Sequence, residues 1–185
     1  MIDVNQLRKG TTFTVDGELY KVIEYSHHKP GRGKASIRTT VRNLRSGSTT
    51  DMTFISGDRV EDIRVENRDV EYLYEDGIFL TFMDLETFEQ PQLRKEVFGG
   101  DILYLKPNLQ LVLKNYDGEI IDYELPNSIE FEVTDSEMAV AGDTATGATK
   151  KVIVETGLQV TVPLFVTVGD VIKVRTEDNA YITRV

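Results

Sequence analysis

A run of basic side chains between residues 29 and 45 is the part of this sequence best suited to chemistry. It holds six Lys and Arg and no Asp or Glu: Lys29, Arg32, Lys34, Arg38, Arg42 and Arg45. Strand alternation over residues 36–44 would place Arg38, Thr40 and Arg42 on one face. Guanidinium groups bind phosphate oxygens through paired hydrogen bonds, and structured RNA is recognised mostly by its backbone and shape. The run therefore predicts an RNA-phosphate surface at Lys29, Arg38 and Arg42; ordinary charge on a solvated hairpin is the alternative.

A loop at residues 29–34, KPGRGK, brackets one arginine with glycines. Pro30 fixes one backbone dihedral angle, whereas Gly31 and Gly33 can adopt angles that other residues avoid. This pattern predicts that Arg32 is presented at the tip of the loop with little steric crowding, and that Lys34 follows it off the tip. An exposed turn with an incidental arginine is the alternative.

Motifs for enzyme chemistry are absent from the sequence. No G-x-S-x-G, H-E-x-x-H or phosphate-loop motif occurs. His27 and His28 are adjacent, so on a strand they would point to opposite faces, which disfavours a shared metal ion. The absence of cysteine excludes disulfides and thiolate metal sites. We therefore expect no catalytic residue, no metal site and no bound cofactor.

Charge is unevenly distributed along the chain. The 185 residues include 21 Lys and Arg and 31 Asp and Glu, for a formal charge of −10. Residues 1–64 hold 11 basic against 8 acidic side chains, residues 65–126 hold 5 against 14, and residues 127–185 hold 5 against 9. A basic region on an acidic body favours one orientation on one defined partner. No apolar run approaches the ~20 residues that span a bilayer, so we expect no membrane partner. The absence of cysteine fits a reducing cytosol, and we expect a cytoplasmic protein and a monomer.

Short alternating runs separated by turn signals predict an all-β chain. Hairpin turns are expected at Asp16-Gly17 and at residues 75–77 and 115–118. Later strands are expected at residues 128–133, 152–155, 159–162, 170–176 and 180–185, and a short helix at residues 92–98. The spacing favours three small β-barrels, at residues 1–64, 65–126 and 127–185. Because a core of that size is marginal alone, the first two should pack together.

Several motifs in order resemble the bacterial elongation factor P family across the whole chain. The first segment contains KPGRG and VRNLRSG, the second YLYEDG and FMDLETFEQ, and the third VPLFVTVGDVIKV. The last motif follows Lys150, Val152, Gly157 and Val160 at the family's spacing. The resemblance implies an SH3-like (KOW-like) N-terminal domain and two OB-fold domains, in an L-shaped, tRNA-like arrangement.

The resemblance also implies a translation elongation factor that binds the 70S ribosome between the P and E sites. Such a factor promotes peptide-bond formation at stalled polyproline sequences by positioning the P-site peptidyl-tRNA. The family's tip position falls on Arg32, and Arg38 and Arg42 would then bind acceptor-stem phosphates. The residues that match the family's contacts to the E-site codon of the mRNA are Gly142, Asp143 and Thr144, and those near the tRNA or ribosome are Tyr181 and Arg184. A simple turn at residues 142–144 and a packing role for Tyr181 are the alternatives.

Arg32 departs from the commonest pattern of the family, which has a modified lysine at the tip. One branch of the family has arginine there and attaches rhamnose to it, although Asn usually follows where this chain has Gly33. Arg32 is therefore expected either to be rhamnosylated by an arginine rhamnosyltransferase or to act unmodified.

Three other functions are alternatives to this one. A YeiP-like paralogue of elongation factor P with a distinct stall specificity is disfavoured by the tip and C-terminal motifs. A stand-alone OB-fold module for single-stranded nucleic acid would need a basic groove with stacking aromatics, and residues 65–126 are too acidic for that. An enzyme of unknown chemistry is the weakest alternative.

Overall fold

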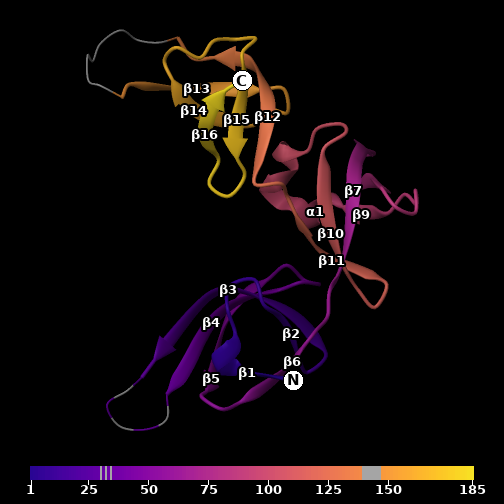
Figure 1. The fold of residues 1–185 in the computed structure, drawn as a ribbon, viewed down its shortest axis with the longest axis vertical. Helices are drawn as coiled ribbons and strands as arrows, with labels where there is room; N and C mark the ends of the chain where they lie inside the picture. Colours follow the sequence, from indigo (N-terminus) through magenta and orange to yellow (C-terminus); the bar gives the residue numbers. More distant parts are fainter. Residues whose placement is uncertain (30, 32, 34, 139–146) are drawn as a thin grey trace. The chain divides into compact units, whose positions relative to one another are not determined.

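The structure is a computed structural model that describes residues 1–29, 31, 33, 35–138 and 147–185. The chain divides into two compact units, one made of Met1–Asn67 with Lys114–Asp122 and the other of Arg68–Leu113 with Tyr123–Val185. The strands of the described residues form three sheets (Figure 1). The predicted all-β class is confirmed.

The N-terminal sheet contains six strands in the order β1-β6-β2-β3-β4-β5. The strands are β1 (Ile2–Asp3), β2 (Thr12–Val15), β3 (Glu18–His28), β4 (Ser36–Asn43), β5 (Thr49–Ile55) and β6 (Arg59–Asp62), with a 3-10 helix η1 at Val4–Gln6. The predicted hairpin at Asp16-Gly17 joins β2 to β3, and both turn residues have positive φ, 52° and 81°. That combination is the type I′ turn, whose twist matches the twist of the strands it joins.

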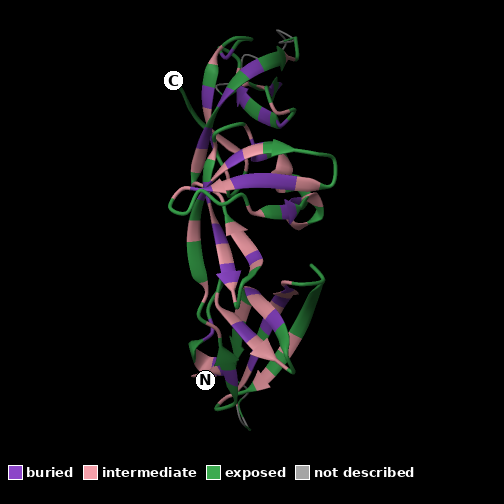
Figure 2. Ribbon diagram, turned by 90° about the vertical axis from the view of Figure 1, so that its right-hand side faces the viewer, coloured by how far each residue is buried: buried purple, intermediate pink, exposed green. Residues whose placement is uncertain are grey.

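Strand β4 alternates between the core and the surface, as predicted. Ile37, Thr39 and Val41 are buried, whereas Arg38 is exposed and Arg42 is half-buried. The core on the inner side also includes Val4, Leu7, Phe13, Val22 and Val60. Buried and exposed residues alternate in this way along many of the strands (Figure 2). A slip of one residue would move both arginines into the core, so burial of the apolar side chains fixes the outward direction of the arginines.

The second sheet contains five strands in the order β11-β10-β7-β8-β9. The strands are β7 (Glu66–Glu75), β8 (Phe79–Asp84), β9 (Gln92–Arg94), β10 (Gln110–Tyr116) and β11 (Glu119–Glu124), with α1 at Lys95–Phe98 and a 3-10 helix η2 at Gly99–Tyr104. The predicted helix at residues 92–98 is therefore wrong in its first half. Leu93 is buried and pairs with Leu80 of β8, so sheet pairing overrides the local helical pattern there.

The β10–β11 hairpin turns at Asp117-Gly118, again with two positive φ values, 50° and 81°. Its residues 114–122 belong to the same compact unit as the N-terminal strands. Two ion pairs join them: Lys21 Nζ lies 2.5 Å from Asp122 Oδ2, and Arg45 Nη2 lies 3.4 Å from Glu119 Oε2. Packing between the first two segments was expected and is found in this hairpin; the exact domain bounds stay predictions.

The C-terminal sheet contains five strands in the order β14-β13-β12-β15-β16. The strands are β12 (Ser128–Ser136), β13 (Thr149–Val154), β14 (Gln159–Pro163), β15 (Val171–Arg175) and β16 (Ala180–Arg184). Tyr104 of η2 enters the core beneath this sheet, and its ring centroid lies 6.4 Å from that of Phe131. Burial raises the pKa of the Tyr104 hydroxyl. The second and third segments thus share apolar contacts within one unit.

Within the described residues, no helix has the length and apolar character needed to cross a membrane. The same part of the chain contains no cluster of three or more His, Cys, Asp or Glu side chains that could hold a metal ion.

Candidate functional site

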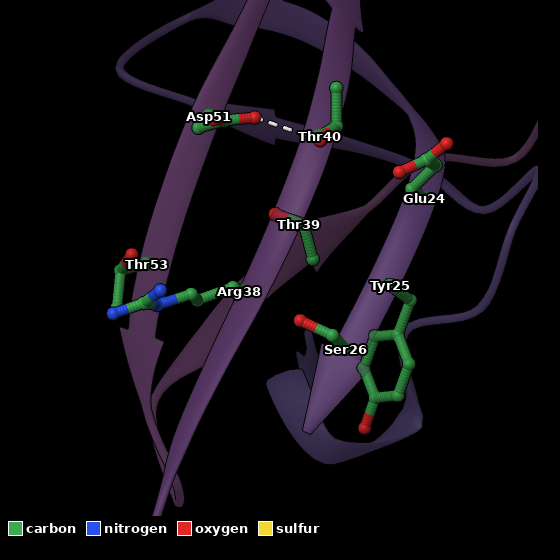
Figure 3. Close-up of a pocket in the computed structure, with 8 residues that line it drawn as sticks. All are labelled: Glu24, Tyr25, Ser26, Arg38, Thr39, Thr40, Asp51 and Thr53. Carbon is green, nitrogen blue, oxygen red and sulfur yellow. Dashed lines mark hydrogen bonds between the residues drawn. The ribbon is translucent and has the colours of Figure 1, made fainter. Parts of the chain in front are cut away.

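The predicted phosphate-binding arginines lie on the outer face of strands β3, β4 and β5. Register across the three strands places their outward side chains in rows. We name these the Arg38 row (Ser26, Arg38, Thr53), the Thr40 row (Glu24, Thr40, Asp51) and the Arg42 row (Lys21, Arg42, Thr49). Figure 3 shows the first two rows together with Tyr25 and Thr39. Neighbouring rows are separated by two residues along a strand, or about 7 Å.

The Arg38 row places a guanidinium group between two hydroxyl side chains. Ser26 of β3 and Thr53 of β5 flank Arg38 on either side, and all three are exposed. These residues contribute to the lining of an open hollow of about 230 Å³. Arg38 makes no hydrogen bond or ion pair with any other residue that the structure describes, so its donors remain available. A guanidinium with neighbouring hydroxyl donors suits a phosphate group.

The Thr40 row adds carboxylates to the same face. Thr40 Oγ1 donates a hydrogen bond to Asp51 Oδ1 at 2.8 Å, and Glu24 lies opposite Thr40 on the other side. The face is therefore less basic than the run at residues 29–45 indicates. Sequence reasoning missed both acids because they come from neighbouring strands. Glu24 reaches the outer face through a β-bulge between Val22 and Glu24, without which the apolar Ile23 would lie opposite Thr40.

The Arg42 row pairs two basic residues across β3 and β4. Lys21 lies opposite Arg42, but its ammonium group is bound to Asp122 of the β10–β11 hairpin. Arg45, the last basic residue of the run, is likewise engaged, because it donates to the Gly17 carbonyl oxygen at 3.2 Å and pairs with Glu119. Of these three cations, Arg42 is therefore the one without an ion pair to another described residue.

The loop after β3 has the steric freedom expected from its glycines. Lys29, Gly31 and Gly33 are exposed. Gly33 has φ = 106°, which a residue with a side chain rarely adopts, and a Cβ built at either glycine would meet no heavy atom within 4 Å. Pro30, Arg32 and Lys34 lie outside the described residues, so the position of Arg32 at the tip stays a prediction.

The C-terminal candidates have structural partners where the chain is described. Tyr181 is half-buried and packs against the core of the third sheet. Arg184 lies 3.5 Å from Asp170 and 5.3 Å above the ring centroid of Phe165. The pKa of the Asp170 carboxyl lies below its ordinary value, chiefly because the backbone N–H of Thr167 donates a hydrogen bond to it. The Thr167 hydroxyl and the Arg184 charge lower this pKa further. Gly142, Asp143 and Thr144 lie outside the described residues.

Three family models match the chain in succession. They are described as the elongation factor P (EF-P) KOW-like domain, at residues 3–60, the EF-P OB domain, at residues 65–123, and the elongation factor P C-terminal domain, at residues 129–184. Elongation factor P of Moorella thermoacetica is 47% identical over 184 residues, and the match covers 100% of both chains.

Two solved structures are similar to this chain. Translation initiation factor 5A from Methanococcus jannaschii matches with a TM-score of 0.51 at 22% identity, over 68% of this chain and 92% of that one. A translation initiation factor eIF-5A family protein from Naegleria fowleri matches with a TM-score of 0.44 at 15% identity, over 67% of this chain and 96% of that one. The first likeness supports a KOW-like barrel followed by an OB fold. With three domain models in order and a full-length relative at 47% identity, the chain belongs to the elongation factor P family and is a translation elongation factor.

Proposed function

We propose that this elongation factor binds the 70S ribosome between the P and E sites and promotes peptide-bond formation at stalled polyproline sequences. The observation that carries the proposal is the outward face of β3–β5, where Arg38 is exposed and flanked by Ser26 and Thr53. Strand β3 ends at His28, and the exposed Lys29 and the loop that contains Gly31 and Gly33 follow it directly. Exposed guanidinium and hydroxyl groups next to a glycine-containing loop suit a protein that binds tRNA phosphates and extends past them.

On this proposal, Arg38 and Arg42 bind phosphates of the acceptor stem of the P-site tRNA. The two residues are four apart on one strand, or about 13 Å, so they contact separate phosphates rather than sharing one. Lys29 adds a further cation at the base of the loop. Arg32 then extends toward the reacting ends of the substrates.

The factor contributes positioning, and the chemistry stays with ribosomal RNA. Proline is a poor donor and acceptor because its ring restricts the geometry of attack. Holding the peptidyl-tRNA near a productive geometry removes part of the entropic barrier to the reaction. In our proposal Gly142, Asp143 and Thr144 contact the mRNA codon in the E site, while Tyr181 and Arg184 lie toward the tRNA or ribosome.

The chemical state of Arg32 is part of the same proposal. Arg32 acts either bare or carrying rhamnose added by an arginine rhamnosyltransferase. Intact-mass analysis of the protein purified from its native host distinguishes the two states, because rhamnose adds a defined mass that peptide mapping assigns to one residue.

Reconstituted translation of a Pro-Pro-Pro reporter tests the function. We expect the protein to speed synthesis across the stall, Arg32→Ala to remove most of that effect, and Arg38→Gln to weaken it. Arg45→Gln is the matched control, because Arg45 is already engaged by Gly17 and Glu119. Equal rates with and without the wild-type protein would refute the function. Full rescue by the Arg38→Gln variant would refute the role assigned to this face.

A further inference from the structure

The turn between β8 and β9 presents an aromatic side chain in a strained conformation. Phe88 is 70% exposed, and its φ is 60°. Positive φ is uncommon outside glycine, asparagine and aspartate, and for a bulky residue it is an outlier. This residue lies in the FMDLETFEQ motif, for which the proposed contacts with tRNA and mRNA give no role.

The turn that carries Phe88 is held by a dense set of hydrogen bonds. The carboxylate of Asp84, which is 3% exposed, accepts from the backbone N–H groups of Glu86 and Thr87 at 2.9 Å each. Phe88 N–H donates to the Asp84 carbonyl oxygen at 2.9 Å, and Asp84 N–H donates to the Glu89 carbonyl oxygen at 2.8 Å. Arg68 adds ion pairs to Asp84 at 3.8 Å and Glu89 at 3.5 Å. The ring is thus displayed on a rigid support.

Among the described residues, no burial and no ring contact accounts for an aromatic residue at position 88. A ring that is mostly exposed contributes little packing, and a left-handed backbone conformation costs about 1–3 kcal/mol for such a residue. Asparagine or glycine would adopt that φ with less strain. A strained residue that the fold does not need is a sign of function, and the property that Phe88 offers is an apolar surface.

The surroundings of Phe88 identify the class of partner. Glu86 and Glu89 lie on either side of it in the turn, with Glu89 paired to Arg68. Asp69, whose carbonyl oxygen accepts from Leu85 N–H at 3.0 Å, is also exposed, so carboxylates still outnumber the one cation here. Carboxylates repel nucleic-acid phosphates and attract basic side chains. We propose that Phe88 is an anchor that inserts into an apolar recess on a basic protein surface.

Binding to purified 70S ribosomes tests the proposal. This test rests on the proposed function, because it takes the ribosome as the partner. Phe88→Asn should weaken binding by roughly 10-fold or more, as expected for loss of a central aromatic anchor. Phe88→Tyr, which keeps the ring, should bind within about twofold of wild type. Phe88→Asn should also unfold at a temperature no lower than wild type, because the strain is relieved and little packing is lost. A packing role for Phe88 would instead lower that temperature.

A photoreactive benzoylphenylalanine at position 88 identifies the contacted molecule on the same ribosomes. Cross-linking to a basic ribosomal protein supports the proposal, whereas cross-linking to ribosomal RNA overturns it in favour of base stacking. Unchanged affinity of Phe88→Asn overturns the anchor while leaving the proposed function intact. Failure of the wild-type protein to bind 70S ribosomes would overturn both.

Discussion

The two carboxylates of the Thr40 row should weaken RNA binding, and their removal should strengthen it. The test variant is Glu24→Gln with Asp51→Asn, which keeps the size of both side chains and leaves an acceptor for the Thr40 hydroxyl. A phosphate bound at the Arg38 row or the Arg42 row lies roughly 7 Å from these carboxylates. In water at physiological salt, two unit charges at that distance interact by roughly 0.25 kcal/mol. Four such repulsions amount to roughly 1 kcal/mol, or about a fivefold change in Kd.

Fluorescence anisotropy with a labelled deacylated tRNA measures the effect. The double variant should bind about fivefold more tightly at low-to-physiological salt, and the gain should shrink as salt rises, because screening shortens the range of the repulsion. The matched control is Glu61→Gln with Asp62→Asn, which removes two exposed carboxylates from β6 of the same unit, off the β3–β5 face. Equal tightening in this control would show that net charge alone acts. No tightening in the test variant would refute the placement of RNA on the face.

Two further predictions concern the second compact unit. Phe98→Ala should lower the free energy of unfolding by about 3–5 kcal/mol. The reason is that Phe98 is 2% exposed and stacks on Phe82 and Tyr123, with ring-centroid distances of 5.8 and 3.9 Å. Urea denaturation measures the loss, and a value below about 1 kcal/mol would contradict the packing. Asp84 should stabilise the fold at neutral pH, because hydrogen bonds from Thr87 and Glu86 lower the pKa of its carboxyl below the ordinary 3.8. A lowered folded-state pKa means that this stabilisation is lost as the pH falls below about 4. The melting temperature of Asp84→Asn should therefore lie below that of wild type at pH 7 and approach it at about pH 2, and a constant difference would contradict the assignment.

Local signals were sufficient for most strands of this chain and for its Asp-Gly turns. The alternation in β4 and the Asp-Gly hairpin turns were readable because one strand face is buried and because type I′ turns need positive φ. Pairing between distant strands could not be predicted. Leu93 forms a strand because it pairs with β8, although the local pattern of residues 92–98 favours a helix. The acidic residues of the candidate site could not be predicted from local sequence either. Glu24 and Asp51 lie near Arg38 only because of the register of three strands and one β-bulge. The positions of Arg32 and of residues 142–144 stay predictions.

The charges on the β3–β5 face argue for recognition by position rather than by bulk attraction. Arg38 and Arg42 are balanced by Glu24 and Asp51, and Lys21 is balanced by Asp122. As a set these groups carry no formal charge, so the long-range field that draws proteins nonspecifically to nucleic acid is weak here. Bidentate hydrogen bonds from the arginines act at short range and only where a phosphate meets each one. On the proposed function, an RNA with phosphates in the matching positions should bind, whereas one that places a phosphate over the Thr40 row should meet two carboxylates.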